Sequence, residues 1–296
     1  MEASEARIAR KGGWFVDFDI HYSEEQEAFR KVIREWLDVY TPKGVSLPPD
    51  GRPLEPEVQQ TMREFRRRLG GQGWLAPSWP RAVGGGGLTE QLEVVLQEEL
   101  RRLTLPPIGD NTRWIPAVMV WGTEEQKQQW VGPALRGETI TWQAFNEPHG
   151  GSDLANVKTT ATKQGEEWVI EGQKSWITGQ FDPDYLWTLA KTDDTRPSHF
   201  NLGVFMIDAN LPGISIEARR LLTGSERTIT FDNVRIPADT LVGDPYQGWE
   251  IVQTILEGER GGFGFQKAED GTIKSVLQFL EHERVRQLND PETYKQ

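Results

Sequence analysis

The stretch WQAFNEPHGGSDLANV, residues 142–157, lies where the sequence changes from helical to extended patterning. It begins as an apolar strand and then gathers an acid, a proline, two adjacent glycines, a serine and an aspartate within a few positions. Such residues form tight turns, because glycine accepts unusual backbone angles and short polar side chains bond to the nearby main chain. The turn fits a phosphate loop, a nucleophile elbow, a metal-binding loop or one edge of a cofactor site.

Outward from this stretch, the pattern predicts an α+β chain with three parts. Helical signals dominate residues 1–139, with capping-box sequences beginning at Ser23 and Thr123. Residues 140–238 alternate with the period of strands, and after Pro237 the helical period returns over 239–296. The strands of the predicted β-barrel or sandwich are 141–145, 158–162, 167–178, 185–191, 202–208, 214–218 and 228–236.

Composition excludes several classes of protein. A hydrophobic content of 36% over 296 residues is enough to bury a sizeable core. A net charge of -12 argues against nucleic-acid and membrane-surface binding, and the basic cluster Arg63, Arg66, Arg67 and Arg68 is expected to be a solvated helix face. The absence of cysteine excludes disulfides and a cysteine nucleophile. With no signal peptide or apolar span in the sequence, a cytoplasmic protein is expected.

The turn itself lacks the signatures of three of its four candidate functions. No glycine-rich segment ends in the Gly-Lys-Ser/Thr of a phosphate loop, and GGFGF at 261–265 lies within a helical pattern. Ser152 is followed by aspartate and leucine, so it does not form a nucleophile elbow. His21, His149, His199 and His282 lack paired spacing, so no metal site is expected. The edge of a cofactor site remains, against the alternative of an ordinary strand exit.

A second segment, KSWITG at 174–179, favours the cofactor site. Side chains alternate along a strand, so Trp176 and Thr178 are expected on the same side. An indole and a hydroxyl placed in this way can back a planar ring and bond to its polar edge. A core tryptophan beside an incidental threonine is the alternative.

A third feature lies on the helix predicted after the β region. An otherwise apolar stripe on this helix comprises Val252, Ile255, Glu259, Gly262 and Gln266. Burial raises the pKa of a carboxyl, which would make Glu259 a usable base near neutral pH. A buried salt bridge to an arginine is the structural alternative. Glu257 points to nearly the opposite face, and Arg260 lies about a quarter turn away.

With these residues in view, the chain resembles the acyl-CoA dehydrogenase family of flavoproteins. The matching segments, in the order and spacing of the family, are YSEEQEAFRKVIREWL (22–37), WPRAVGGGGLTEQLEVVLQEEL (79–100), WGTEEQKQQWVGPALRGE (121–138), FNEPHGGSDLANVKTTA (145–161), WVIEGQKSWITG (168–179), FDNVRIPADTLVGDPYQGWEIV (231–252) and LEGERGG (256–262). The resemblance implies an N-terminal helical domain, a middle β domain and a shortened C-terminal helical domain, with FAD between the β domain and the helices.

The resemblance also assigns residues to the site. Those implied to contact FAD are Gln143, Phe145, Asn146, Gly151, Ser152, Trp176, Ile177 and Thr178. Those implied to contact the acyl-CoA are Ser152, Glu257 and Arg260. Glu259 stands where some members carry the catalytic base. Two positions depart from the family: Asn146 replaces a threonine or serine, and His149 replaces a small residue.

The implied reaction is α,β-dehydrogenation of an acyl-CoA thioester, as in β-oxidation of a fatty acid or a steroid side chain. A carboxylate removes the α proton while the β hydrogen leaves as hydride to flavin N5, and electrons then pass to an electron-transfer flavoprotein. A homo-oligomer, or a hetero-oligomer with a related subunit, is expected. The alternatives are a non-catalytic partner subunit, favoured by Asn146 and the short C-terminus, and an acyl-CoA oxidase or flavin monooxygenase on the same fold.

Overall fold

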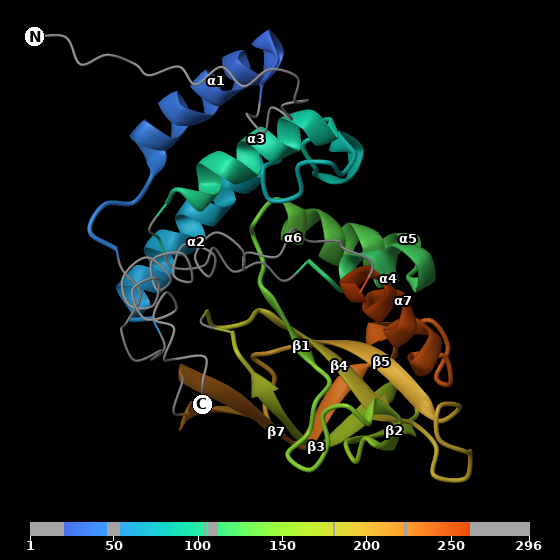
Figure 1. The fold of residues 1–296 in the computed structure, drawn as a ribbon. Coiled ribbons are helices and arrows are strands. Elements are labelled where there is room, and N and C mark those ends of the chain that lie inside the picture. Colours follow the sequence, from blue (N-terminus) through green and yellow to red (C-terminus); the bar gives the residue numbers. More distant parts are fainter. Residues whose placement is uncertain are drawn as a thin grey trace, which may run out of the picture.

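A computed structural model describes residues 21–45, 54–103, 105, 112–179, 181–221 and 224–260, apart from the side chains of residues 224 and 257–260. Within these ranges, helices precede the sheet in the chain, and one helix follows it (Figure 1). No helix in the described ranges is long and apolar enough to cross a membrane.

The N-terminal part is helical, as predicted. Its helices are α1 (Glu24–Tyr40), α2 (Pro56–Gly71), α3 (Glu90–Arg101), α4 (Ile115–Trp121), α5 (Glu124–Gln126) and α6 (Gly132–Leu135), with a 3-10 turn η1 (Arg81–Val83) and a π segment η2 (Lys127–Val131). Both capping boxes form: the main-chain N–H of Gln26 donates to Ser23 Oγ at 3.2 Å, and that of Gln126 donates to Thr123 Oγ1 at 3.2 Å. These bonds satisfy amide groups that a helix start otherwise leaves unpaired.

The expectation of a solvated basic face on α2 is wrong for one arginine. Arg66 is only 2% exposed and lies among the large buried side chains of the helix. Arg67 and Arg68 are exposed. An arginine stem is long and apolar enough to pack in a core, and a count of charges along the helix does not reveal this.

The middle part is one eight-stranded sheet, in the order β6-β7-β3-β2-β4-β5-β8, with β1 pairing in parallel to β4. All seven predicted strands are present, and the two-residue β8 was not predicted. The strands are β1 (Thr141–Ala144), β2 (Thr160–Gln164), β3 (Glu167–Ile177), β4 (Tyr185–Lys191), β5 (Leu202–Asp208), β6 (Ile214–Leu221), β7 (Gly224–Pro237) and β8 (Leu241–Val242), with 3-10 turns η3 (Leu154–Asn156) and η4 (Ala238–Thr240).

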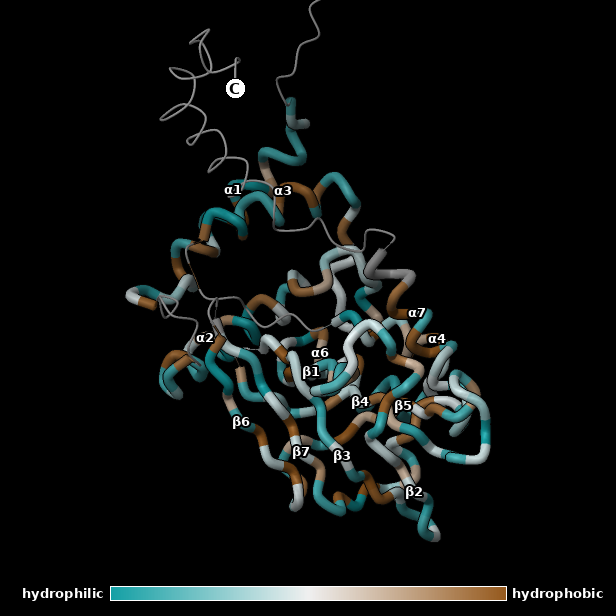
Figure 2. The backbone as a smooth tube through the Cα atoms, turned by 60° about the horizontal axis from the view of Figure 1, so that its bottom comes forward, coloured by the Kyte–Doolittle hydropathy of each residue, from teal (hydrophilic) through white to brown (hydrophobic). Residues whose placement is uncertain are grey.

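The two faces of this sheet belong to different hydrophobic cores. On β1, Trp142 and Ala144 join a core shared with α1, α2 and α3, whereas Phe145, just beyond the strand, joins a core shared with α4 and α7. Alternation along each strand produces this division, and Figure 2 shows hydrophobic and hydrophilic positions mixed along β3 and β7. Thr141 and Gln143 therefore share the second face with Trp187 of β4.

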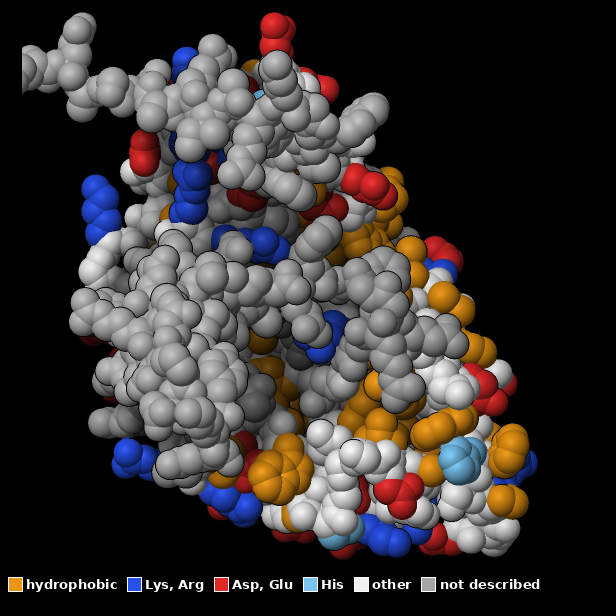
Figure 3. Space-filling model, in the orientation of Figure 1, with side chains coloured by type: hydrophobic (Ala, Val, Ile, Leu, Met, Phe, Trp, Pro, Cys, Tyr) orange, Lys and Arg blue, Asp and Glu red, His pale blue; other side chains and the backbone are white. Residues whose placement is uncertain are grey.

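Helix α7 (Gly248–Arg260) packs on α4 and β5, over that second face (Figure 1). Val252 and Ile255 are buried, which confirms the apolar stripe as far as Ile255. The indole N–H of Trp121 donates to Thr254 Oγ1 at 3.0 Å and joins α4 to α7. In Figure 3 hydrophobic side chains gather at the lower right, over α4, α7 and β5.

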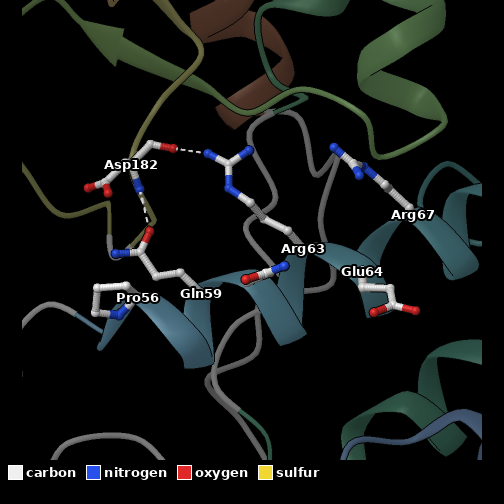
Figure 4. A pocket seen from close by; sticks show the side chains of 7 residues that line it. Pro56, Gln59, Arg63, Glu64, Arg67 and Asp182 are labelled. Carbon is white, nitrogen blue, oxygen red and sulfur yellow. Dashed lines mark hydrogen bonds between the residues drawn. The ribbon is translucent and has the colours of Figure 1, made fainter.

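Polar contacts at Asp184 join α2 to the sheet. Its carboxylate accepts the main-chain N–H of Ile140 at 2.7 Å and pairs with Arg63 at 3.0 Å. Arg63 also donates to the carbonyl of Asp182, whose N–H donates to Gln59 at 3.0 Å (Figure 4). An open cavity of about 710 Å³ lies here, lined by Pro56, Gln59, Gln60, Arg63, Glu64, Arg67 and Asp182. None of the predicted site residues lines it.

Candidate functional site

The turn after β1 is closed by main-chain bonds and seated on a buried carboxylate. The N–H of Glu147 donates to the carbonyl of Gly150 at 2.9 Å, and the N–H of Gly150 donates back at 3.1 Å. The Glu147 side chain is 3% exposed. It accepts the main-chain N–H groups of Lys158 at 2.6 Å and Thr159 at 2.8 Å. The carboxylate therefore ties the turn to the segment that enters β2.

Lys174 of β3 completes this anchor. Its fully buried Nζ lies 2.9 Å from Glu147 Oε1 and donates to the carbonyl of Phe145 at 3.1 Å. The N–H of Ser175 donates to the carbonyl of Asn146 at 2.9 Å. One acid and one base, each from a different motif, thus fix FNEPHGGSD against KSWITG. We call residues 145–152 together with 174–178 the lip.

Both charges of the anchor are held in the interior. Burial alone would raise the pKa of Glu147, but the Lys174 charge and the hydrogen bonds from Lys174, Thr159 and Lys158 hold it below its usual range. Burial lowers the pKa of Lys174 to about 8, against the opposing effect of Glu147. Both groups are therefore charged at neutral pH. A paired charge avoids most of the cost that an isolated buried charge would carry.

The lowered pKa of Lys174 predicts that stability rises in mild alkali. The folded protein releases this proton near pH 8, whereas the unfolded chain holds it until about 10.5, so the unfolded state binds more protons in between. Urea unfolding of wild type and Lys174→Met checks this. From about pH 7.5 to about 9.5, the unfolding free energy of wild type relative to the variant should increase by about 1–2 kcal/mol. A constant or shrinking difference contradicts the assignment.

Trp176 is the unusual residue of the lip. Its φ is 64°, in the left-handed region, and it lies in a register shift between Lys174 and Ile177 where β3 pairs with β7. Its side chain is 50% exposed, whereas Ser175 and Ile177 are buried. A bulky residue in this region costs about 1–2 kcal/mol. The bulge thus presents a large aromatic face outward in a strained conformation, as residues at binding sites often are.

Because the backbone at Trp176 is strained, we expect that replacing this residue changes the free energy of unfolding very little. Trp176→Gly should leave the unfolding free energy of the ligand-free protein within about 1 kcal/mol of wild type, because relief of the left-handed φ offsets lost contacts and the entropy of glycine. Trp168→Gly in the same strand is the matched control. Trp168 is 4% exposed, and its loss should cost about 3–5 kcal/mol. Equal losses in urea titrations would show that Trp176 is a core residue.

The outer side of the turn is open. A Cβ on Gly150 would meet nothing within 4 Å, and one on Gly151 would meet only the side chain of Asn146, at 3.9 Å. Neither glycine has a positive φ, so neither conformation nor packing within the described chain requires it. The side chains of Asn146 and Ser152 make no hydrogen bond to other described residues. Open space beside free hydrogen-bonding groups fits a polar, planar or phosphorylated ligand.

The structure brings the predicted cofactor residues of the two motifs together. Phe145 and Asn146 are bonded through their carbonyls to Lys174 and Ser175, directly before Trp176. Thr178, just beyond β3, is exposed, as Trp176 is. The prediction that the two lie on the same side of a strand assumed strict alternation, and the bulge at Trp176 breaks that alternation. The side-chain oxygen of Gln143 is buried without a hydrogen-bond partner in the described ranges.

The predicted base is not brought to the lip by any described contact. Glu257, Glu259 and Arg260 are on the backbone of α7, but their side chains lie outside the described residues.

Sequence reasoning missed Glu147 and Lys174. It weighed the glycines, the serine and the tryptophan of the two motifs for what they offer a ligand. The available signal was a single acid in one motif and a single base in the other, each next to an apolar strand. Opposite charges in such surroundings are buried only when paired.

Known proteins resemble the chain in both sequence and fold. Residues 23–138 match the family model "Acyl-CoA dehydrogenase, N-terminal domain", and residues 143–234 match "Acyl-CoA dehydrogenase, middle domain". Acyl-CoA dehydrogenase IpdE1 of Mycobacterium tuberculosis is 32% identical over 247 residues, which are 80% of this chain and 64% of that protein. The mitochondrial short-chain specific acyl-CoA dehydrogenase of Homo sapiens is 30% identical over 208 residues, 68% of this chain and 50% of that protein.

A solved structure, the Tcur3481-Tcur3483 steroid ACAD, superposes with a TM-score of 0.67 at 26% identity, over 93% of this chain and 71% of that one. The chain spans less than two thirds of the length of both curated relatives. Two matching domains in the family's order, and a matching fold, lead to one conclusion: the chain belongs to the acyl-CoA dehydrogenase family.

Proposed function

We propose that this chain binds FAD at the lip and dehydrogenates an acyl-CoA thioester between its α and β carbons. The observation that supports this most strongly is the conformation of Trp176, which is half exposed and has a strained backbone. It lies beside a turn whose outer side is open and which the Glu147–Lys174 pair fixes in place. Strained backbone conformations cluster at ligand-binding sites, where they hold a side chain in the position that contacts the ligand. Members of the acyl-CoA dehydrogenase family are FAD-dependent flavoproteins.

The residues of the lip have chemistry suited to this cofactor. Trp176 offers an aromatic face, Thr178 and Asn146 offer hydrogen bonds to a heterocycle edge, and Gly151 and Ser152 offer donors for phosphate. The complete proposed set is Gln143, Phe145, Asn146, Gly151, Ser152, Trp176, Ile177 and Thr178. When bound, FAD supplies the oxidant that accepts the β hydrogen with its electron pair.

Glu259 is the proposed base. The buried Val252 and Ile255 place one side of α7 against the core, and Glu259 continues that side by four residues. A carboxylate in apolar surroundings has a raised pKa and removes a weakly acidic proton more effectively. Ser152, Glu257 and Arg260 are the proposed contacts to the thioester substrate.

Partners are part of the proposal. The acceptor of electrons is an electron-transfer flavoprotein, and the chain is expected to assemble with copies of itself or with a related subunit. The steroid ACAD that resembles this chain carries a name that joins two proteins, Tcur3481 and Tcur3483, which supports assembly with a related subunit.

A non-catalytic partner subunit is the second candidate, and Asn146 favours it. The resemblance implies a threonine or serine at this position, and the side-chain amide of Asn146 lies 3.9 Å from where a Cβ on Gly151 would be. A larger side chain in this position takes up space at the open side of the lip.

Purification distinguishes the two candidates. If the chain itself holds FAD, preparations of the chain, alone or with a related subunit, are yellow and release about one FAD per chain on denaturation. Trp176→Ala should then lose most of the flavin, whereas Trp168→Phe in the same strand should keep it. If the flavin in a two-chain preparation is unaffected by Trp176→Ala in this chain, the partner holds it, and the non-catalytic role is correct.

A further inference from the structure

One face of the sheet carries a cluster of polar atoms that have no partner among the described residues. The hydroxyl of Thr141, the amide oxygen of Gln143, and the indole N–H groups of Trp114 and Trp187 are all buried without a hydrogen bond to that part of the chain. Both tryptophans are 0% exposed. Buried polar atoms are nearly always bonded, and a buried indole N–H usually finds an acceptor, so each exception needs an explanation.

The residues that carry these four atoms are neighbours in the fold. Gln143 and Trp187 are paired residues of the parallel strands β1 and β4, and Thr141 is two residues away on the same face of β1. The ring of Trp114, at the start of α4, lies 6.1 Å from that of Trp187, centroid to centroid. The cluster therefore lies between the sheet and α4, and we call it the indole cluster.

The indole cluster lies between the two elements that the proposed reaction needs. Trp114 and Trp187 share one hydrophobic core with Phe145 of the lip and with Val252 and Ile255 of α7. Gln143 begins the segment that leads into the lip, and α7 carries Glu259 in its last turn. An acyl group bound between the lip and α7 would lie against the core to which both tryptophans belong.

The hydrogen-bond donors and acceptors of the indole cluster indicate which functional group of a ligand they would bind. The indole N–H groups are donors that match an oxygen acceptor, and the oxygens of Gln143 and Thr141 can accept from a hydroxyl. None of the four side chains carries a charge, and the shared core is apolar. A carboxylate, a phosphate or an ammonium would lack the counter-charge that burial demands.

We propose that the indole cluster recognises a ketone or hydroxyl oxygen on the acyl part of the substrate, and that Trp114 and Trp187 are the specificity-determining residues. This rests on the proposed function, because it assumes an acyl-CoA between the lip and α7. An acyl chain with an oxygen at the matching carbon gives the buried indole N–H groups an acceptor. A plain chain leaves them unpaired, and a site built to bond an oxygen discriminates strongly against an analogue that lacks it.

The test uses the flavin-loaded protein and acyl-CoA thioesters of equal length, with one ketone placed at successive carbons. Wild type should prefer one ketone position over the plain chain by at least about tenfold in kcat/KM. Trp187→Phe and Trp114→Phe should remove that preference while they retain turnover of the plain chain. Trp168→Phe, in β3 and in the opposite core, is the matched control and should keep the preference.

A second readout does not depend on turnover. Thioether analogues cannot be dehydrogenated in the same way, and their binding is followed by the change they cause in the flavin spectrum. The keto analogue should bind wild type at least about tenfold more tightly than the plain one, and Trp187→Phe should bind both equally.

Three results would overturn the inference. If the plain chain is turned over as well as every ketone isomer, the indole cluster does not select an oxygen, and the proposed function stands. If the preference survives in both tryptophan variants, other residues produce it. If no thioester is turned over and no analogue perturbs the flavin, the proposed function fails together with the inference.

Discussion

Lys174→Met is expected to lower the free energy of unfolding by about 3–5 kcal/mol, because methionine leaves the buried Glu147 carboxylate and the carbonyl of Phe145 without the Lys174 nitrogen that donates to both. Glu147 keeps the main-chain N–H groups of Lys158 and Thr159, but these donors do not replace the one that is lost. Glu147→Gln should cost a similar amount, since it leaves the ammonium of Lys174 buried against a neutral amide. Urea titration of ligand-free protein at neutral pH measures both losses.

The double variant separates the pair from its surroundings. Removing both charges leaves no uncompensated ion, so the double variant should cost about 1–3 kcal/mol less than the sum of the single losses. Arg235→Met is the control, because Arg235 and Glu167 pair at 3.2 Å on β7 and β3 with about half of each side chain exposed. Its loss should stay below about 1 kcal/mol. Strictly additive single losses would mean that the pair does not anchor the lip.

Glu259→Gln is expected to leave FAD bound and to slow the acyl-CoA-dependent bleaching of the flavin by a factor on the order of 10³. Glutamine has nearly the shape of glutamate but cannot take up the α proton. The α proton of a thioester is weakly acidic, and no hydrogen bond to the thioester carbonyl replaces the missing base. Stopped-flow absorbance without oxygen measures the rate, and the flavin content of the variant is measured in parallel.

The control for Glu259 is on the same helix. Glu250→Gln removes the same charge from the first turn of α7 and should leave the rate of bleaching within about threefold of wild type, a difference that corresponds to less than 1 kcal/mol. If Glu259→Gln bleaches as fast as Glu250→Gln, Glu259 is not the base.

The order and type of the elements followed from the sequence. The short apolar run YLWTLAK became β4 with the predicted ends, because a strand that is buried on both faces has a nearly continuous apolar sequence. The helix starts at Ser23 and Thr123 could be predicted from the sequence equally well, since a capping box is a local interaction. Strand β8 has two residues, too few for any periodic pattern.

Features that depend on distant contacts did not follow from the sequence. The burial of Arg66 depends on the packing of α2 and not on its charge pattern. The ion pair joins residues 27 positions apart, and its partners were visible only as isolated charges. The left-handed φ of Trp176 arises from a register shift against β7, and pairing irregularities leave no mark in one strand. The indole cluster likewise requires β1, β4 and α4 to be in place.

Mixing the FAD-loaded protein, without oxygen, with acyl-CoA thioesters of different chain length tests most directly whether this chain dehydrogenates an acyl-CoA. At least one thioester should bleach the visible absorption of the flavin, with about one α,β-unsaturated thioester formed per flavin reduced. If stoichiometrically bound FAD retains its absorption with every thioester, the proposed dehydrogenation is wrong.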